Sequence, residues 1–211
     1  MIQHRRKQSQ KWLTRLLLMI LTTTALAIHP TFAKIKPPRI KQDTPSTKLN
    51  LQEGEIVFKG TKGQYTGYVI ARANLSSIWQ VLTDYDNFEK YMPNVAESNL
   101  VESRGNQKVF EQVQIFQLLM FTRNAKVKIV VTEDYPEMIT FKLAEGELKK
   151  LQGSWKIESI DSNKYLITHQ VTVEPNIQSR FNRDLFFAVY EDTVKKTLAA
   201  ISQESAKRSG L

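Results

Sequence analysis

Apolar and polar residues alternate with a period of two along most of the chain after residue 55, a pattern typical of strands with one buried face. The alternating segments span 55–59, 65–72, 95–103, 108–118, 124–134, 138–145, 151–160 and 164–174. Short polar breaks separate the later segments and predict an antiparallel meander. The first two segments flank the glycine-rich stretch 60–63 and form either a hairpin or one bent strand. We therefore expect a sheet of about six to seven strands.

In two other stretches the apolar residues recur with the spacing of an α-helix. In the shorter one, Asn74 is placed to cap a helix whose apolar face consists of Leu75, Ile78, Trp79 and Leu82. A polar break at 84–87 and a second, aromatic-bearing helical turn follow it. The longer helix begins near Ile177, and its apolar face consists of Phe181, Leu185, Ala188, Val189, Val194, Leu198 and Ile201, widened by Phe186, Phe187 and Tyr190. So wide a face is explained by core packing against the sheet, or by part of it lining a cavity.

Strand alternation predicts which side chains point inward. Lys126 and Lys128 must face water, so their alternating neighbours face the interior, and the same reasoning selects Val127, Ile129, Val131, Ile139, Phe141, Leu143, Trp155 and Ile157. His169 shares its side of a strand with apolar residues, and Glu111 shares its side with Val109. Unless a bulge shifts the register, we expect both His169 and Glu111 to point inward.

An inward Glu111 and His169 suggest an acid/base pair whose pKa values are shifted by burial. The alternatives are that His169 is a hydrogen-bonded core or ligand-orienting group, and that a bulge turns Glu111 to water. His169 is the one histidine outside the N-terminal segment, and the chain has no cysteine. No phosphate-binding glycine motif is present. We therefore expect no Ser-His-Asp relay without His169, no disulfide, and no tightly bound metal or nucleotide cofactor.

The N-terminal segment has the composition of a targeting sequence. Five basic residues without an acid precede an apolar run at 16–28, and 31–33 offer a small-x-Ala cleavage site. We interpret residues 1–33 as a signal peptide for general secretion, with an uncleaved anchor as the alternative, and 34–53 as a flexible tail. The expected compartment is the periplasm or the thylakoid lumen, with membrane association left open.

Charge argues against nucleic acid as a partner. The net charge is +9, but the five basic residues before Ala33 account for much of it and the remainder carries about +4. The remaining basic residues are scattered, which allows only a weak attraction to anionic membranes.

An apolar hairpin tip followed by cations suggests peripheral membrane contact through Leu118, Leu119, Met120 and Phe121. The alternative is that the strands run through this tip and cover a cavity mouth. We expect a monomer.

Three stretches together resemble a known superfamily. They are 79–94, with its helix, polar break and aromatic turn, then 145–155, and the helix from Ile177 onward. This combination is similar to the SRPBCC or START-like superfamily, in particular its polyketide cyclase/dehydrase and coenzyme Q-binding members of the cyanobacterial and chloroplast kind. The resemblance covers roughly residues 54 to 207, and we assign the domain to 54–208. It implies an α+β helix-grip fold, in which a curved antiparallel sheet, two short helices and a long C-terminal helix enclose a hydrophobic cavity.

The resemblance and the alternation together give a candidate ligand site. We expect aromatic or apolar walls, a helical lid and two orienting groups, namely Trp79, Phe88, Tyr91, Phe141, Trp155 and Tyr165 as walls, Phe181, Leu185, Phe186 and Val189 as lid, and His169 with Glu111 as orienting groups. Trp79 and Trp155 are explained equally well as core residues.

The expected function is that of an exported, non-catalytic binding or transfer protein for a hydrophobic small molecule of the lipid, isoprenoid quinone, carotenoid or tetrapyrrole class. Superfamily membership alone does not fix activity, because one scaffold hosts carriers and enzymes. The alternatives are a polyketide cyclase/dehydratase-type enzyme that acts in the same cavity, and a protein-interaction module with a filled core.

Overall fold

The computed structural model describes residues 51–118 and 121–211, and the side chains of 116–123 are left out of this description. The predicted signal peptide and most of the predicted tail therefore lie outside the described residues. So do Leu119 and Met120 of the predicted membrane-contacting tip, as well as the side chains of Leu118 and Phe121. Within the described residues, no helix is long and apolar enough to cross a membrane.

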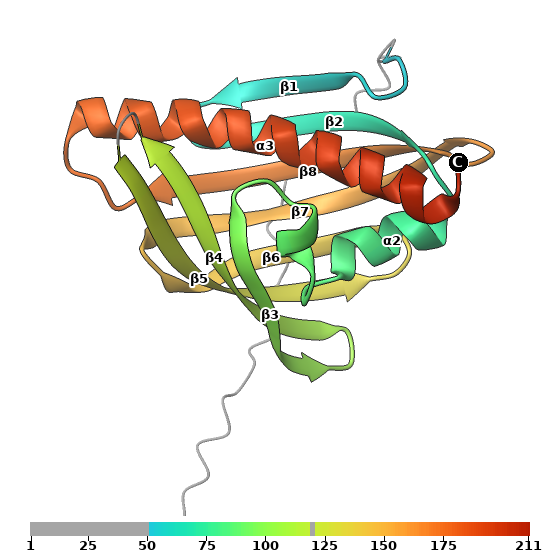
Figure 1. The fold of residues 1–211 in the computed structure, drawn as a ribbon, viewed down its shortest axis with the longest axis horizontal. Coiled ribbons are helices and arrows are strands. Elements are labelled where there is room, and N and C mark those ends of the chain that lie inside the picture. The colour runs from blue at the N-terminus through green and yellow to red at the C-terminus, as the bar shows by residue number, and fades with distance from the viewer. Residues whose placement is uncertain (1–50, 119–120) are drawn as a thin grey trace, which may run out of the picture. The chain divides into compact units, whose positions relative to one another are not determined.

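In the part of the chain that the structure describes, eight strands form one antiparallel sheet (Figure 1). In chain order they are β1 Ile56–Thr61, β2 Gln64–Arg72, β3 Val95–Arg104, β4 Gln107–Leu118, β5 Phe121–Asp134, β6 Met138–Gly146, β7 Leu148–Asp161 and β8 Lys164–Pro175. Their spatial order is β1-β2-β8-β7-β6-β5-β4-β3. The meander from β3 to β8 is therefore extended at its β8 edge by β2, which pairs with β8, and then by β1. The predicted antiparallel fold class is confirmed.

The sheet has more strands than the six to seven expected, because 55–59 and 65–72 form a hairpin and not one bent strand. The turn between β1 and β2 needs glycine. Gly63 has a φ of +87°, and a Cβ at this position would lie 2.1 Å from the carbonyl oxygen of Val173. A glycine is the one residue that satisfies both conditions without strain.

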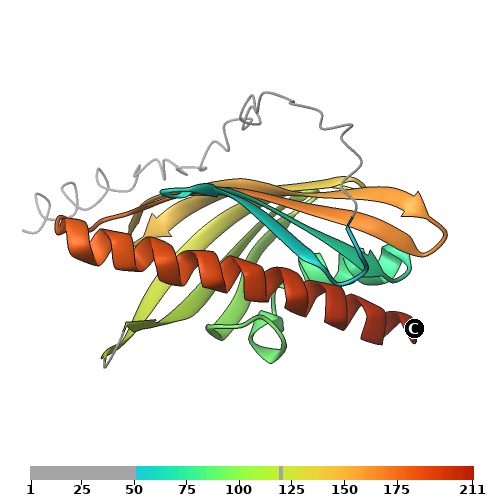
Figure 2. The same ribbon diagram turned by 90° about the horizontal axis from the view of Figure 1, so that it is seen from above.

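Helices lie on one side of the sheet. The short helix α2 spans Leu75–Thr83, the 3₁₀ turn η1 spans Phe88–Lys90, and the long helix α3 spans Arg180–Ser209. The side chain of Asn74 accepts a hydrogen bond from the Ser77 backbone N–H at 2.8 Å, which confirms the predicted cap. Viewed from above, the sheet curves over α3, which runs along its concave side (Figure 2).

The core fills the space between α3 and the sheet. Val69, Ile167, Leu198 and Ile201 are fully buried there. Helix α3 also packs on α2, and near its C-terminus Arg208 fastens the two elements together. Its guanidinium lies 2.9 Å from an Asp84 carboxylate oxygen beyond the end of α2. These contacts hold the C-terminal half of α3 in place. The middle of the helix lies beside a cavity between the helix and the sheet.

Candidate functional site

A cavity of about 150 Å³ lies between the middle of α3 and the concave face of the sheet. Its wall includes side chains from α2, η1, the loop after η1, strands β3 to β8, and α3. The lining residues are Leu82, Tyr85, Phe88, Met92, Pro93, Asn94, Val95, Phe110, Gln112, Gln114, Ile129, Val131, Ile139, Phe141, Leu151, Trp155, His169, Tyr190, Thr193, Val194 and Thr197. These lining residues include no Lys, Arg, Asp or Glu, so the wall carries no charge while His169 is neutral.

One wall of the cavity is a group of three nearly parallel rings on adjacent strands. Trp155 of β7 is the cross-strand partner of His169 of β8, and their ring centroids are 3.7 Å apart at an interplanar angle of 18°. Phe141 of β6 lies 5.7 Å from His169 at 19°. Gly153 makes room for this arrangement, because a Cβ there would lie 2.7 Å from the Phe141 ring and 2.0 Å from the Gln170 carbonyl oxygen.

His169 is the one titratable side chain of this wall, and it is 6% exposed. Its Nδ1 lies 3.3 Å from the carbonyl oxygen of Ser154. Burial lowers the pKa of His169 to about 3, and the contact with Ser154 offsets only part of that shift. At neutral pH the imidazole is therefore uncharged. A group with this pKa is a weak general base and has no proton to give as a general acid near pH 7.

A second aromatic cluster also lines the cavity. Tyr85 stacks on Phe110 with centroids 4.8 Å apart, and Phe88 meets Phe110 edge-on at 5.7 Å. The Tyr85 hydroxyl donates a hydrogen bond of 2.8 Å to the Glu133 carboxylate. Burial, reinforced by that carboxylate, raises the pKa of Tyr85 well above its ordinary value. This tyrosine therefore stays protonated, and its ring is part of the packed core.

Polar side chains gather where α3 faces the start of β3 and the middle of β4. The Asn94 amide donates a hydrogen bond of 3.0 Å to the Thr193 hydroxyl, which donates in turn to the Val189 carbonyl oxygen at 2.9 Å. On β4, the Gln114 amide donates to the Gln112 side-chain oxygen at 3.2 Å. Within residues 51–118 and 121–211, no three histidine or acidic side chains lie close enough to hold a metal ion.

Four of the predicted ligand-site residues, Phe88, Phe141, Trp155 and His169, line the cavity. Strand alternation therefore places His169 correctly. Its role in binding stays a prediction.

Three predicted wall residues lie elsewhere in the molecule. Trp79 meets the Tyr135 ring edge-on at a centroid distance of 5.0 Å. Tyr91 donates a hydrogen bond of 2.7 Å to the Val81 carbonyl oxygen. Tyr165 pairs with Ala71 across β2 and β8 and packs beside the core. These three aromatic residues support the frame around the cavity and are absent from its wall.

The predicted lid residues also lie outside the cavity wall. Phe181 is 71% exposed at the start of α3. Phe186 is buried, but it stacks on Tyr190 at 5.7 Å within the core. Leu185 and Val189 are partly buried on a neighbouring side of the helix. The cavity side of α3 starts at Tyr190, about two and a half turns after Phe181, and includes Thr193 and Thr197.

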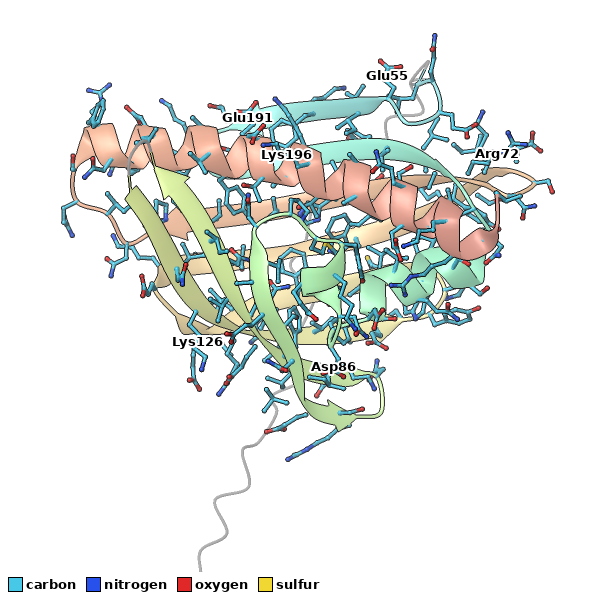
Figure 3. All side chains as sticks on the ribbon, in the orientation of Figure 1. Glu55, Arg72, Asp86, Lys126, Glu191 and Lys196 are labelled. Atoms are coloured by element: carbon cyan, nitrogen blue, oxygen red, sulfur yellow. The ribbon has the colours of Figure 1, made fainter. Side chains whose placement is uncertain are left out.

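The prediction that Glu111 points inward is wrong. Glu111 is the cross-strand partner of Lys128, and its carboxylate lies 3.0 Å from the Lys128 ammonium and 3.4 Å from that of Lys126. The hydrogen bond from Lys128 lowers the pKa of Glu111. Figure 3 shows Lys126 extending away from the ribbon near β4 and β5. The proposed acid/base pair of Glu111 with His169 therefore does not exist.

The inward side of β4 consists of Phe110, Gln112 and Gln114, which sequence reasoning did not select. Val109 and Val113 suggested the opposite side, because β4 has apolar residues on both faces. The signal that finds the correct face is the pairing of Glu111 with the lysines of the next strand, since opposite charges face each other across a hairpin. Other missed residues lie in the loop after η1 or on the polar part of α3.

Comparison with known proteins places this geometry in context. The family model described as polyketide cyclase / dehydrase and lipid transport matches residues 72–201. The Zhui aromatase/cyclase from Streptomyces has a similar structure, with a TM-score of 0.60 and 14% identity over 73% of this chain and 96% of that chain. A STAR-related lipid transfer protein from Xanthomonas axonopodis gives a TM-score of 0.56 and 19% identity over 72% of this chain and 94% of that chain.

The human StarD13 lipid transfer and protein localization domain is similar as well, with a TM-score of 0.54 and 14% identity over 74% of this chain and 87% of that chain. No curated protein sequence matches this chain. At these identities the solved structures establish a shared helix-grip fold, which enzymes and lipid transfer proteins both use.

Proposed function

This chain belongs to the polyketide cyclase/dehydrase and lipid transport family, and on that premise we propose that it binds and transfers a hydrophobic small molecule without converting it. The observation that carries this proposal is the cavity between α3 and the sheet, whose wall is apolar and aromatic with a few convergent polar groups. Walls of this composition favour burial of apolar ligand surface. The candidate ligand classes remain lipid, isoprenoid quinone, carotenoid and tetrapyrrole.

The volume limits how much of such a ligand is enclosed. A cavity of about 150 Å³ matches the size that holds a single benzene-like ring in an engineered protein core. A longer molecule must therefore place one ring or a short chain segment inside and extend the rest out of the cavity.

An enzyme of the aromatase/cyclase kind is the alternative, since one structural neighbour has that name. Such an enzyme needs a proton donor or acceptor at the reacting atom. His169 lies in the cavity, but its pKa of about 3 keeps it neutral, and Glu111 lies on the other face of the sheet. These two observations favour a binding role. Turnover that disappears in His169→Phe while ligand affinity persists would instead favour the enzyme.

A matched pair of variants on α3 tests the proposal. Thr197 lies in the cavity wall, whereas its neighbour Lys196 is exposed on the outer side of the helix. We expect prodan, a neutral environment-sensitive dye, to bind the native protein with one-to-one stoichiometry. Thr197→Trp should weaken this binding at least about tenfold by filling the cavity, and Lys196→Trp should leave it unchanged. Equal binding by both variants contradicts a cavity site.

The same titration separates the third hypothesis, a protein-interaction module with a filled core. Such a module predicts no stoichiometric dye binding by the native protein or by either variant. Native structure in each sample is checked by circular dichroism, so that absence of binding cannot be attributed to unfolding.

We also propose export and peripheral membrane contact, on sequence grounds. The basic and apolar pattern of residues 5–28 supports export, and the apolar stretch 118–121 supports docking on an anionic membrane. Export is tested by the intact mass of the protein from its own host, which should lack residues 1–33. An N-terminus at residue 1 in the purified protein would favour an uncleaved anchor.

A further inference from the structure

The cavity wall selects against charged ligands. Among the described residues that line it, there is no Lys, Arg, Asp or Glu. A carboxylate or ammonium group in this space would lose its hydration without gaining an ion pair, which is strongly unfavourable. The polar groups of the wall are the hydroxyls of Tyr85, Tyr190, Thr193 and Thr197, the side-chain amides of Asn94, Gln112 and Gln114, the indole N–H of Trp155 and the imidazole of His169.

The hydrogen bond of His169 determines which ring nitrogen carries the proton. The Ser154 carbonyl oxygen has lone pairs and no proton, so its 3.3 Å contact with Nδ1 is a hydrogen bond only when Nδ1 is protonated. A neutral imidazole has one proton. The other nitrogen, Nε2, therefore has a free lone pair and accepts hydrogen bonds.

Nε2 is accessible from the cavity. His169 lies in the cavity wall. Among the described residues, its Nε2 is not one of the fully buried side-chain atoms without a partner, so this nitrogen keeps accessible surface. Among residues 51–118 and 121–211 with described side chains, no hydrogen-bond donor reaches this nitrogen. A side chain that is more than nine-tenths buried thus presents an unpaired acceptor to the cavity.

The direction of this acceptor is fixed. The lone pair of Nε2 lies in the plane of the imidazole ring. That plane is held by Trp155, with centroids 3.7 Å apart at 18°, and by Phe141, at 5.7 Å and 19°. A ring that rotates freely would offer a weak and undirected contact. A ring held by two neighbours offers a preorganised one.

We propose that Nε2 of His169 accepts a hydrogen bond from a hydroxyl group of the ligand, so that the cavity selects neutral, hydroxyl-bearing ring compounds over their carboxylates. This inference rests on the proposed binding function and defines the chemical class of the ligand. His169 is a specificity-determining residue in this account. Hydroxylated rings satisfy the acceptor, and ligands without a donor leave it unpaired in an apolar environment, which costs affinity.

The test uses the full-length chain and three naphthalene probes at pH 7. The probe 2-naphthol has a hydroxyl donor, 2-fluoronaphthalene has a fluorine of similar size and no donor, and 2-naphthoate has a carboxylate. Dissociation constants are measured by fluorescence titration for wild type, His169→Phe and Tyr68→Phe. Phe retains an aromatic ring at position 169 but removes the acceptor. Tyr68, a tyrosine outside the cavity wall, is the control.

The ratio of the 2-fluoronaphthalene to the 2-naphthol dissociation constant should fall roughly three- to tenfold in His169→Phe, the worth of one hydrogen bond. Tyr68→Phe should keep the wild-type ratio. For wild type, 2-naphthoate should bind at least about a hundredfold more weakly than 2-naphthol. The two-probe ratio cancels effects of the substitution that both probes share, such as a change in cavity volume.

The possible failures are distinguishable. An unchanged ratio in His169→Phe, with both probes still bound, refutes the inference and leaves the proposed binding function intact. Binding of 2-naphthoate as tight as that of 2-naphthol refutes selection for neutral ligands. No binding of any probe by folded wild type refutes both the inference and the function. If His169→Phe does not fold, as judged by thermal unfolding, the smaller His169→Leu substitution is used for the same comparison.

Discussion

Mild acidification should destabilise this protein through His169. The native state holds the imidazole neutral with a pKa of about 3, because the ring is buried among Trp155, Phe141 and the strand backbone. The unfolded chain exposes the ring, and its pKa returns to the ordinary value of 6.5. Below pH 6.5 the unfolded state therefore binds a proton at His169, and the native state does not until the pH approaches 3. Stability is lost as the pH falls.

The size of this effect follows from the two pKa values. Above pH 6.5 both states hold a neutral ring, and His169 contributes no pH dependence. Between the two values each pH unit costs about 1.4 kcal/mol, so about 2 kcal/mol of unfolding free energy is lost between pH 7 and pH 5. That loss is a large fraction of the 5–15 kcal/mol typical of a domain.

Urea denaturation followed by tryptophan fluorescence measures this loss. The free energy of unfolding is obtained by linear extrapolation at pH 7, 6 and 5, and constant slopes show that the same transition is observed. The range stops at pH 5 because Glu111 and Glu204, whose pKa values are lowered by neighbouring cations, add their own acid destabilisation at lower pH. The His169→Phe variant supplies the reference, since it removes only the contribution of this ring.

The expected result is a difference of about 2 kcal/mol between wild type and His169→Phe in their losses from pH 7 to pH 5. Equal losses in the two proteins would refute the reasoning, because they would mean that the native ring takes up its proton as readily as the unfolded one. A ring that is protonated in the native state would also be unable to select ligands as a neutral acceptor.

Three further predictions concern the residues that support the site and the proposed membrane contact. Gly153→Ala should lower the free energy of unfolding by more than about 2 kcal/mol in urea titration, because the new Cβ would lie 2.0 Å from the Gln170 carbonyl oxygen; a smaller loss would show that β7 and β8 separate easily. Arg208→Ala should cost about 1–2 kcal/mol in the same assay, because it breaks the ion pair with Asp84 that joins α3 to the end of α2 and the ion pair with Glu204 within α3; an unchanged midpoint would contradict this role. Leu119→Glu combined with Met120→Glu should abolish flotation with anionic liposomes, and wild-type flotation by this variant removes the docking proposal.

Strand alternation predicted much of the fold. The segments 138–145 and 164–174 match β6 and β8 to within a residue, and Asn74 caps α2 as expected. His169 was placed correctly because β8 has a consistent pattern of buried residues on one face. Where local chemistry and global burial agree in this way, sequence alone is sufficient.

The site was harder to predict because its wall is partly polar. Gln112, Thr193 and Thr197 face the cavity, although their side chains indicate a solvated surface in any hydrophobicity pattern. For the same reason, the apolar spacing along α3 predicted that Phe181 and Phe186 face the ligand, instead of the threonines that line the cavity. Register shifts between β3 and β4 add to the difficulty. A cavity wall that includes polar side chains departs from the simple rule of apolar inside and polar outside.

The most direct test of the central claim is native mass spectrometry of the full-length chain, purified without detergent from a membrane-rich host, beside Thr197→Trp and Lys196→Trp. We expect a discrete added mass in wild type and Lys196→Trp, which organic extraction identifies as one neutral hydrophobic molecule, and no added mass in Thr197→Trp. An unliganded mass for all three proteins, persisting after incubation with a total lipid extract, would contradict a hydrophobic-ligand-binding function.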